Sequence, residues 1–312
     1  MLKITKKSWI FYAFATFFLF GITNFALGYI GEITGKNINS SVSSIIVLWI
    51  GMGTLGIMAP PFLKKIKSSI KKNHHCNFSI FGIISGLTLA LGMLTLKIGF
   101  VADPFSKGPI VSIVSANAML VAILAWIILR EKLNRFQLWG MTIIITGITL
   151  IASGGNSIAS FRGILFGIAT MFLFGATNFL LKYSGEKGAD SINMSVVLWR
   201  SAGTFGLLTL ALSLLTGRGL SGLDNSTAIL ISFFAGFALG LGMLTLKLAM
   251  TKGPAGPAIA LAGSNALMVT ILDLAAFGYI PSVLKIIGMI TAILGIIIIA
   301  TAKPSKVSVV PK

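Results

Sequence analysis

Long apolar runs, separated by short polar and basic stretches, form the main pattern of this sequence. Each run holds roughly 20 residues, enough for a helix to cross the hydrocarbon core of a bilayer. The runs lack the alternation of polar and apolar residues that is typical of barrel strands. We therefore predict an all-α integral membrane protein with ten transmembrane helices. The spans are expected at Trp9–Tyr29, Ser44–Leu63, Phe78–Phe100, Pro109–Leu129, Gln137–Ser153, Arg162–Tyr183, Met194–Thr216, Ser226–Met250, Pro257–Phe277 and Ser282–Ala302.

The sequence also contains an internal duplication. The segment Phe20–Phe25 returns with one change as Phe174–Phe179, and Leu91–Lys97 returns unchanged as Leu241–Lys247. Five spans per copy is an odd number, so the second copy enters the membrane from the opposite side. The pattern thus predicts two inverted five-helix repeats, residues 1–153 and 154–302, with a tail at 303–312. Duplicated apolar units of this kind are typical of secondary transporters.

Composition and charge agree with a membrane location. Hydrophobic residues make up 55% of the chain and charged residues only 10%, with a mean hydropathy of +0.96, which excludes a water-soluble protein. The net charge of +18 lies mainly between the apolar runs, which favours a lipid bilayer over nucleic acid as the partner. Eighteen of the 25 Lys and Arg residues fall on one side of the membrane and six on the other. The positive-inside rule therefore predicts a multi-pass protein of the cell membrane with both termini cytoplasmic.

Four asparagines inside the apolar spans are candidate solute ligands. Asn24 and Asn178 occupy matching positions in the two copies, and so do Asn117 and Asn265. A carboxamide in lipid has to find hydrogen-bond partners. These side chains either bind a solute in a central cavity or join helices to one another. The sequence leaves both interpretations open.

Charged residues in or near the spans are further candidates. Lys97 and Lys247 end the third and eighth spans, where their amines either reach the lipid headgroups or lie at the two mouths of a cavity. Arg200 lies deeper, inside the seventh span, and is a candidate solute ligand. Asp273 is the only acid well inside an apolar span. It either pairs with Lys97 or Lys285, or its protonation couples transport to a proton gradient.

Signs of enzymatic chemistry are weak. The sequence has no spacing typical of a Ser-His-Asp triad, a carboxylate pair or a metal site, and His74-His75-Cys76 are adjacent residues of a basic loop. Gly51–Gly56 fits a dinucleotide fingerprint by letter, but it lies inside a span with no preceding strand. We therefore expect no enzyme activity, no metal and no cofactor.

A motif at the end of the first copy indicates a family. The segment Leu129-Arg130-Glu131-Lys132-Leu133, followed by Gln137, Gly140 and Gly147, resembles the pattern that closes each repeat of EamA-like transporters, a branch of the drug/metabolite transporter superfamily. Gly108-Pro109 and Gly256-Pro257 open the fourth and ninth spans in a similar way. The resemblance covers residues 9–302. It implies a central cavity lined by spans one to four and six to nine, with five and ten as supports.

The second copy departs from this pattern. Phe277–Ile280 stands where the Glu motif would fall, and Lys285 stands in place of Gln137. The Asn positions and the Lys-Gly-Pro opening also resemble sugar-uptake members of the superfamily, so a particular substrate does not follow from the resemblance.

Together, the duplication and the resemblance predict a secondary transporter that moves a small-molecule substrate, an organic metabolite, by alternating access. Sugar uptake and export of an amino acid or other metabolite remain open. From a different class, a non-transporting membrane scaffold or an accessory subunit is the alternative. A homodimer is a possible assembly.

Overall fold

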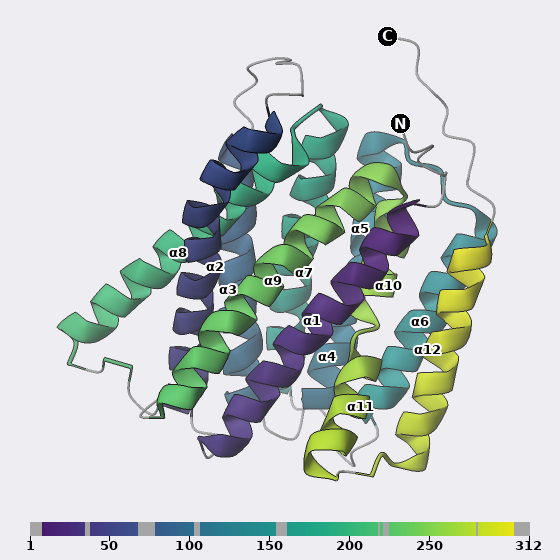
Figure 1. The fold of residues 1–312 in the computed structure, drawn as a ribbon. Helices are drawn as coiled ribbons and strands as arrows, with labels where there is room; N and C mark the ends of the chain where they lie inside the picture. Colours follow the sequence, from purple (N-terminus) through teal and green to yellow (C-terminus); the bar gives the residue numbers. More distant parts are fainter. Residues whose placement is uncertain are drawn as a thin grey trace.

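The computed structural model describes residues 8–34, 38–67, 79–102, 107–153, 161–217, 219–220, 225–278 and 280–302. Twelve α-helices and no strand are found in these residues, and they form one bundle (Figure 1). The helices are α1 (Ser8–Ile33), α2 (Ile38–Lys67), α3 (Ser79–Ala102), α4 (Lys107–Ser115), α5 (Asn117–Leu129), α6 (Arg135–Ser153), α7 (Phe161–Glu186), α8 (Ser191–Leu215), α9 (Ser226–Lys252), α10 (Ala255–Gly263), α11 (Ala266–Phe277) and α12 (Val283–Thr301).

The ten predicted spans are confirmed. Nine described segments are long and apolar enough to cross a membrane, and a shorter apolar helix at Ile113–Leu129 supplies the tenth. The protein is therefore a multi-pass membrane protein. The predicted fourth and ninth spans each consist of two helices, α4 with α5 and α10 with α11, which the sequence analysis did not foresee.

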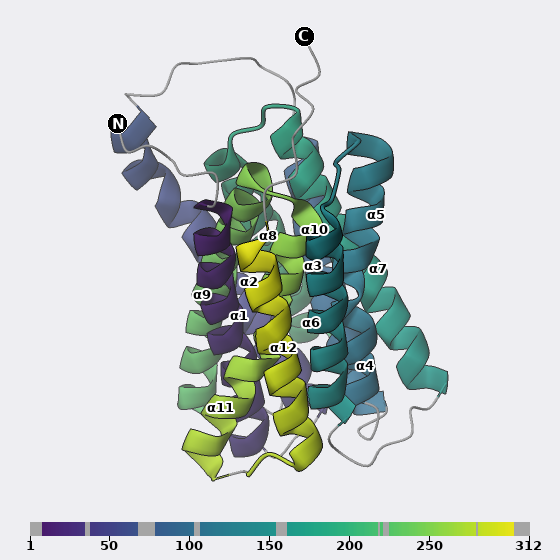
Figure 2. The ribbon, with the colours of Figure 1, turned by 90° about the vertical axis from the view of Figure 1, so that its right-hand side faces the viewer.

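The two sets of five crossings run in opposite directions. Helix α1 begins, and α12 ends, at the upper end of the bundle in Figure 1; we call this end the terminal end. Helix α7, the first of the second set, begins at the opposite end (Figure 2). The inversion predicted from the odd number of spans is thus present. The predicted boundary between the repeats adjoins residues 154–160, and these residues, like the tail 303–312 and the loop His74–Cys76, lie outside the described residues.

The repeats meet along a seam between α2 and α8. At Gly53 an added Cβ would lie 2.6 Å from the Cα of Gly203, so the two backbones touch directly. Trp49 and Trp199 lie beside this contact and are almost completely buried. The ring of Trp49 packs edge-on against Phe205 at 5.0 Å. The matched tryptophans are therefore packing residues of the seam, which requires glycine at the contact because no side chain fits there.

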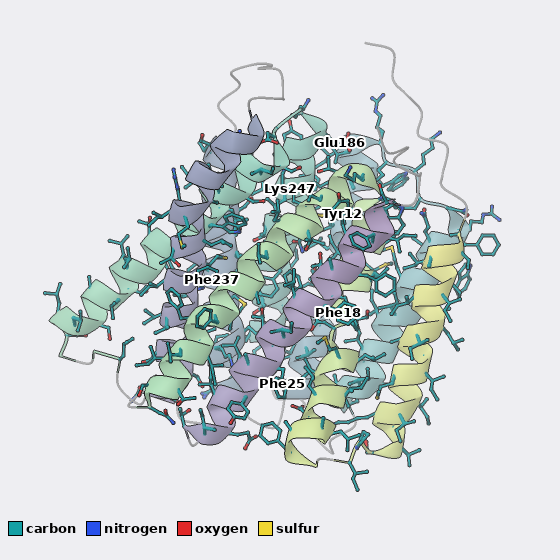
Figure 3. All side chains as sticks on the ribbon, viewed as in Figure 1. Tyr12, Phe18, Phe25, Glu186, Phe237 and Lys247 are labelled. Atoms are coloured by element: carbon teal, nitrogen blue, oxygen red, sulfur yellow. The ribbon has the colours of Figure 1, made fainter. Side chains whose placement is uncertain are left out.

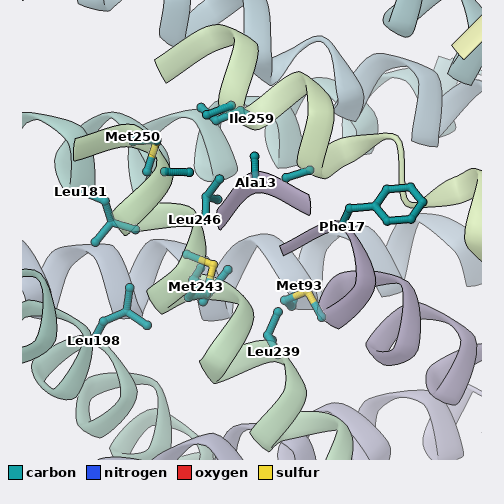
Figure 4. Close-up of a cluster of buried hydrophobic side chains, with 14 of the residues drawn as sticks. Ala13, Phe17, Met93, Leu181, Leu198, Leu239, Met243, Leu246, Met250 and Ile259 are labelled. Carbon is teal, nitrogen blue, oxygen red and sulfur yellow. The ribbon is translucent and has the colours of Figure 1, made fainter. Parts of the chain in front are cut away.

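A buried apolar cluster connects the helices of the bundle, and some of its members also line the cavity described below. Leu239, Met243, Leu246 and Met250, on successive turns of α9, contribute to it together with side chains of other helices (Figure 4). The cluster joins helices of both repeats, including α1 through Ala13 and Phe17, and α7 through Leu181. Its unbranched methionines fill irregular gaps between helices that cross at different angles.

The contact between Gly53 and Gly203 gives a testable expectation. Gly203→Ala should lower the free energy of unfolding by about 1–3 kcal/mol, because the added methyl group would meet backbone that cannot move aside. Thermal unfolding of the purified protein in detergent measures the change. Gly28→Ala is the matched control, since a Cβ there meets nothing within 4 Å. Equal unfolding temperatures for the two variants would contradict the close contact.

Candidate functional site

A cavity of about 710 Å³ lies between the two repeats. Most of its lining is apolar and includes Phe20 and Phe174, which occupy matching positions. Helices α1 to α7 and α9 to α11 all contribute to the lining. The fifth span was expected to be a support, but it is α6 and adds Ile148 and Ile151, while no residue of α8, the seventh span, is in the described lining. The polar and charged lining residues are Thr23, Asn24, Glu32, Ser41, Lys97, Ser115, Asn117, Thr177, Asn178, Asn265 and Thr270.

The cavity extends from the middle of the bundle to the end opposite the termini. Gly28, Gly31 and Glu32 of the last turns of α1 line it, as does Phe100 near the end of α3. On the other side of the midplane, the lining includes no described residue of α7 beyond Asn178. The described lining therefore extends toward the end opposite the termini and not toward the terminal end.

Two asparagine pairs join the repeats across the cavity. Asn24 donates from Nδ2 to Oδ1 of Asn265 over 2.8 Å. Asn178 donates from Nδ2 to Oδ1 of Asn117 over 3.2 Å. Each pair connects a long helix of one repeat to a helix break of the other, and the two pairs occupy equivalent places. A role in solute binding and a role in joining helices were the two alternatives for these asparagines, and the geometry is compatible with both at once.

The asparagines at the breaks also explain why the helices are interrupted there. Asn117 donates from Nδ2 to the carbonyl of Val114 over 2.7 Å, and Asn265 donates to the carbonyl of Ala262 over 2.9 Å. A side chain thus satisfies a carbonyl that a backbone N–H would satisfy in a continuous helix. This keeps the backbone hydrogen-bonded at the level of the membrane where open carbonyls are most costly.

Of the four asparagines, Asn24 is the most accessible from the cavity. Its side chain is exposed, whereas Asn117, Asn178 and Asn265 are buried. Among the described residues, none donates a hydrogen bond to its Oδ1. Asn24 therefore presents an acceptor to the cavity.

The asparagine pairs generate a stability comparison. Asn178→Ala should lower the free energy of unfolding by about 1–3 kcal/mol, because it leaves the buried Oδ1 of Asn117 without its donor. Asn24→Ala should cost less, since water in the open cavity can replace the lost amide. Thermal unfolding of both variants in detergent measures the difference. An equal loss for the two would contradict the distinction between a buried and a cavity-facing pair.

The matched lysines Lys97 and Lys247 lie in different surroundings. Lys97 lines the cavity, where it is the cation of the lining and Glu32 the anion. Lys247 is fully buried and donates to the carbonyl of Leu181 over 3.0 Å and to Oγ of Ser184 over 2.8 Å. In this conformation Lys247 neither reaches the headgroups nor lines the cavity, so the two sequence-based interpretations both fail for it here.

Arg200 and Asp273 lie away from the cavity lining. Arg200 is exposed on α8, and its Nε donates to the carbonyl of Gly56 over 2.9 Å. Asp273 is half-buried on α11, within the electrostatic influence of Lys285 and Glu32. The roles predicted for them, solute binding and proton coupling, therefore stay predictions without support from contacts in this conformation.

A charged cluster that the sequence analysis did not assemble closes the terminal end. Lys182 on α7 is 5% exposed, and its Nζ lies 3.0 Å from Glu186 and 3.4 Å from Glu131. The same ammonium donates to the carbonyls of Met250 over 2.7 Å and Gly253 over 3.2 Å. Figure 3 shows Glu186 and Lys247 near the terminal end of the bundle. We call these contacts of Lys182 the Lys182 cluster.

Glu131, the acid of the family motif, also caps a helix. Its Oε1 accepts from the backbone N–H of Ala255 over 3.0 Å, in the first turn of α10. A carboxylate is favoured there because the N–H groups of the first turn have no partners inside the helix. The Lys182 cluster thus joins the loop between α5 and α6 to α7, α9 and α10. One signal in the sequence was present: Lys182 precedes Glu186 by four residues, the spacing of an ion pair on one helix face.

Glu131 should make stability depend on pH. Burial raises the pKa of its carboxyl above the ordinary 4.5, which outweighs the opposing effect of Lys182. The folded state then binds more protons than the unfolded state just above pH 4.5, so the contribution of this carboxyl to stability falls as pH rises through its folded pKa.

We therefore expect Glu131→Gln to gain unfolding temperature relative to the wild type as pH rises from 4.5. Thermal unfolding across a pH series measures it. Glu186→Gln, whose parent side chain is 48% exposed, is the control. Parallel curves for Glu131→Gln and the wild type would contradict the pKa shift.

Comparison with known proteins agrees with this architecture. Residues 161–301 match the EamA-like transporter family. This match covers the second copy of the duplicated unit. The resemblance seen at the sequence level is thereby confirmed, and it is confirmed in the copy that lacks the Glu motif.

A solved structure shares this fold over nearly the whole chain. A crystal structure of a protein with 15% sequence identity superposes with a TM-score of 0.72 and covers 95% of this chain and 99% of its own. At that identity the likeness concerns the fold alone. None of the curated proteins is significantly similar to this chain.

Proposed function

We propose that this EamA-like protein is a secondary transporter that moves a small organic metabolite across the cell membrane by alternating access. The observation that carries the proposal is the cavity itself. It lies between inverted repeats, meets two broken helices at Asn117 and Asn265, and is closed toward one end of the bundle. Solute sites of secondary transporters lie at such helix breaks.

The lining suits a solute with a polar group and an apolar body. Asn24 offers a carbonyl acceptor, and Lys97 and Glu32 lie on the route to the open end. Phe20 and Phe174 contribute apolar surface on opposite sides. Both sugars and amino acids offer hydrogen-bond donors to Asn24, so both belong in a substrate screen.

In alternating access, the two repeats move relative to each other so that the cavity opens first at one end of the bundle and then at the other. In the conformation seen here, the positively charged terminal end is closed. The excess of Lys and Arg on that side supports a cytoplasmic location for it. The cavity would then face the outside, and rocking of the repeats would carry the solute to the cytoplasm or back.

Transport by purified protein tests the proposal. Proteoliposomes preloaded with one unlabelled solute from a panel of sugars, amino acids and other metabolites should take up its labelled form in a saturable manner. Asn24→Ala should lower that uptake about tenfold, the effect of one lost hydrogen bond of about 1.4 kcal/mol.

Thr142→Ala is the control for this experiment, because Thr142 is exposed on α6 outside the cavity lining. The absence of saturable uptake for every solute would contradict the proposal and favour a membrane scaffold or accessory subunit.

A further inference from the structure

The Lys182 cluster has no counterpart in the first repeat. In this part of the chain the copies are offset by 154 residues, so Gly28 corresponds to Lys182 and Glu32 corresponds to Glu186. Around Glu131 the offset is 148 residues, as it is between Asn117 and Asn265, so this acid corresponds to Tyr279. A glycine cannot supply an ammonium group. Position 28 therefore cannot form the ion pairs that Lys182 forms at the terminal end.

The packing is also denser around Lys182 than around the equivalent position, Gly28. Gly31 and Gly185 are symmetry partners: a Cβ at Gly31 meets nothing within 4 Å, while a Cβ at Gly185 lies 3.0 Å from Oγ1 of Thr251. Helix α7 packs directly against α9 and α10, whereas contact between the corresponding helices α1 and α3 is far sparser. One end of the bundle is thus closed around Lys182, and the other is open around Gly28.

One partner of Lys182 lies across the boundary between the repeats. The Lys182 ammonium contacts Glu131 in the loop after α5, which belongs to the first repeat, while the carbonyls of Met250 and Gly253 at the end of α9 hold it within the second repeat. Moving the repeats apart at the terminal end breaks the ion pair between Lys182 and Glu131. It would also leave Glu131, which is only 17% exposed, without its nearest positive charge.

We propose that Lys182 is a positioning residue for transport: it holds the terminal end closed, and because Gly28 cannot do the same at the other end, the protein rests with its cavity open opposite the termini. This inference rests on the proposed function. It assigns the resting conformation to an ion pair, Lys182 with Glu131, whose two members are both replaced in the other copy.

Thiol labelling tests the proposal without any solute. Cys76 is the only cysteine, so Cys76→Ala gives a background for the single-cysteine reporters Gly31→Cys and Gly185→Cys. In detergent, a charged methanethiosulfonate reagent should label position 31 quickly and position 185 slowly. Adding Lys182→Gln should raise the labelling rate at position 185 at least tenfold and lower the rate at position 31. Lys182→Arg should restore much of the original pattern, because a guanidinium keeps the charge.

Lys252→Gln is the matched control. Lys252 lies at the end of α9, at the same end of the bundle, but its side chain is exposed and lies over the ring of Tyr12. Removing this charge should leave both labelling rates unchanged. Because each comparison is made within one reporter, any strain that a cysteine at position 185 introduces against Thr251 cancels.

Unchanged labelling in Lys182→Gln would overturn the proposal, and so would a rise at both positions, which indicates general loosening. If Lys182→Gln does not fold, Glu131→Gln removes the other partner of the same ion pair. It should likewise raise the labelling rate at position 185 and lower the rate at position 31. Labelling and uptake are independent readouts. If Lys182→Gln leaves the labelling rates unchanged while the wild type takes up solute, only this inference is rejected. If the labelling rates change as expected but no solute is taken up, only the transport function is rejected.

Discussion

The structure depends on one constraint: inside a bilayer, every backbone N–H and C=O group needs a partner within the protein. This constraint accounts for the helices, and it also determines where they can be interrupted. At the two breaks, the side chains of Asn117 and Asn265 satisfy carbonyls that the interrupted helices leave open. The same asparagines then accept hydrogen bonds from the opposite repeat. The side chains that donate to the backbone at the breaks thus also connect the two halves and form part of the cavity wall.

Much of this architecture could be predicted from the sequence, because hydrophobic length and duplication act over whole segments. The ten crossings, their inversion and the central place of the four asparagines follow from those signals. The helix breaks could not be predicted in the same way. Ser-Ala-Asn and Gly-Ser-Asn within an apolar run are compatible with a continuous helix, and only the partners supplied by α1 and α7 favour the interruption.

The surroundings of individual charges were the least predictable part of the site. Lys97 and Lys247 end identical heptapeptides, yet one lines an open cavity and the other is buried against a carbonyl and a serine hydroxyl. A sequence repeat gives both residues the same local helix. It cannot say which end of the bundle is closed, and burial depends on that. Lys182 was missed for a related reason: its partners Glu131 and Met250 lie far from it in the sequence, and only the fold brings them together.

The backbone contact between Gly53 and Gly203 has a consequence for how the two halves can diverge. Each glycine occupies the room that a side chain on the other would need. A larger residue in either copy is therefore excluded by its twin. After the duplication, each of these two positions constrains the other. Replacing either glycine alone would push α2 and α8 apart.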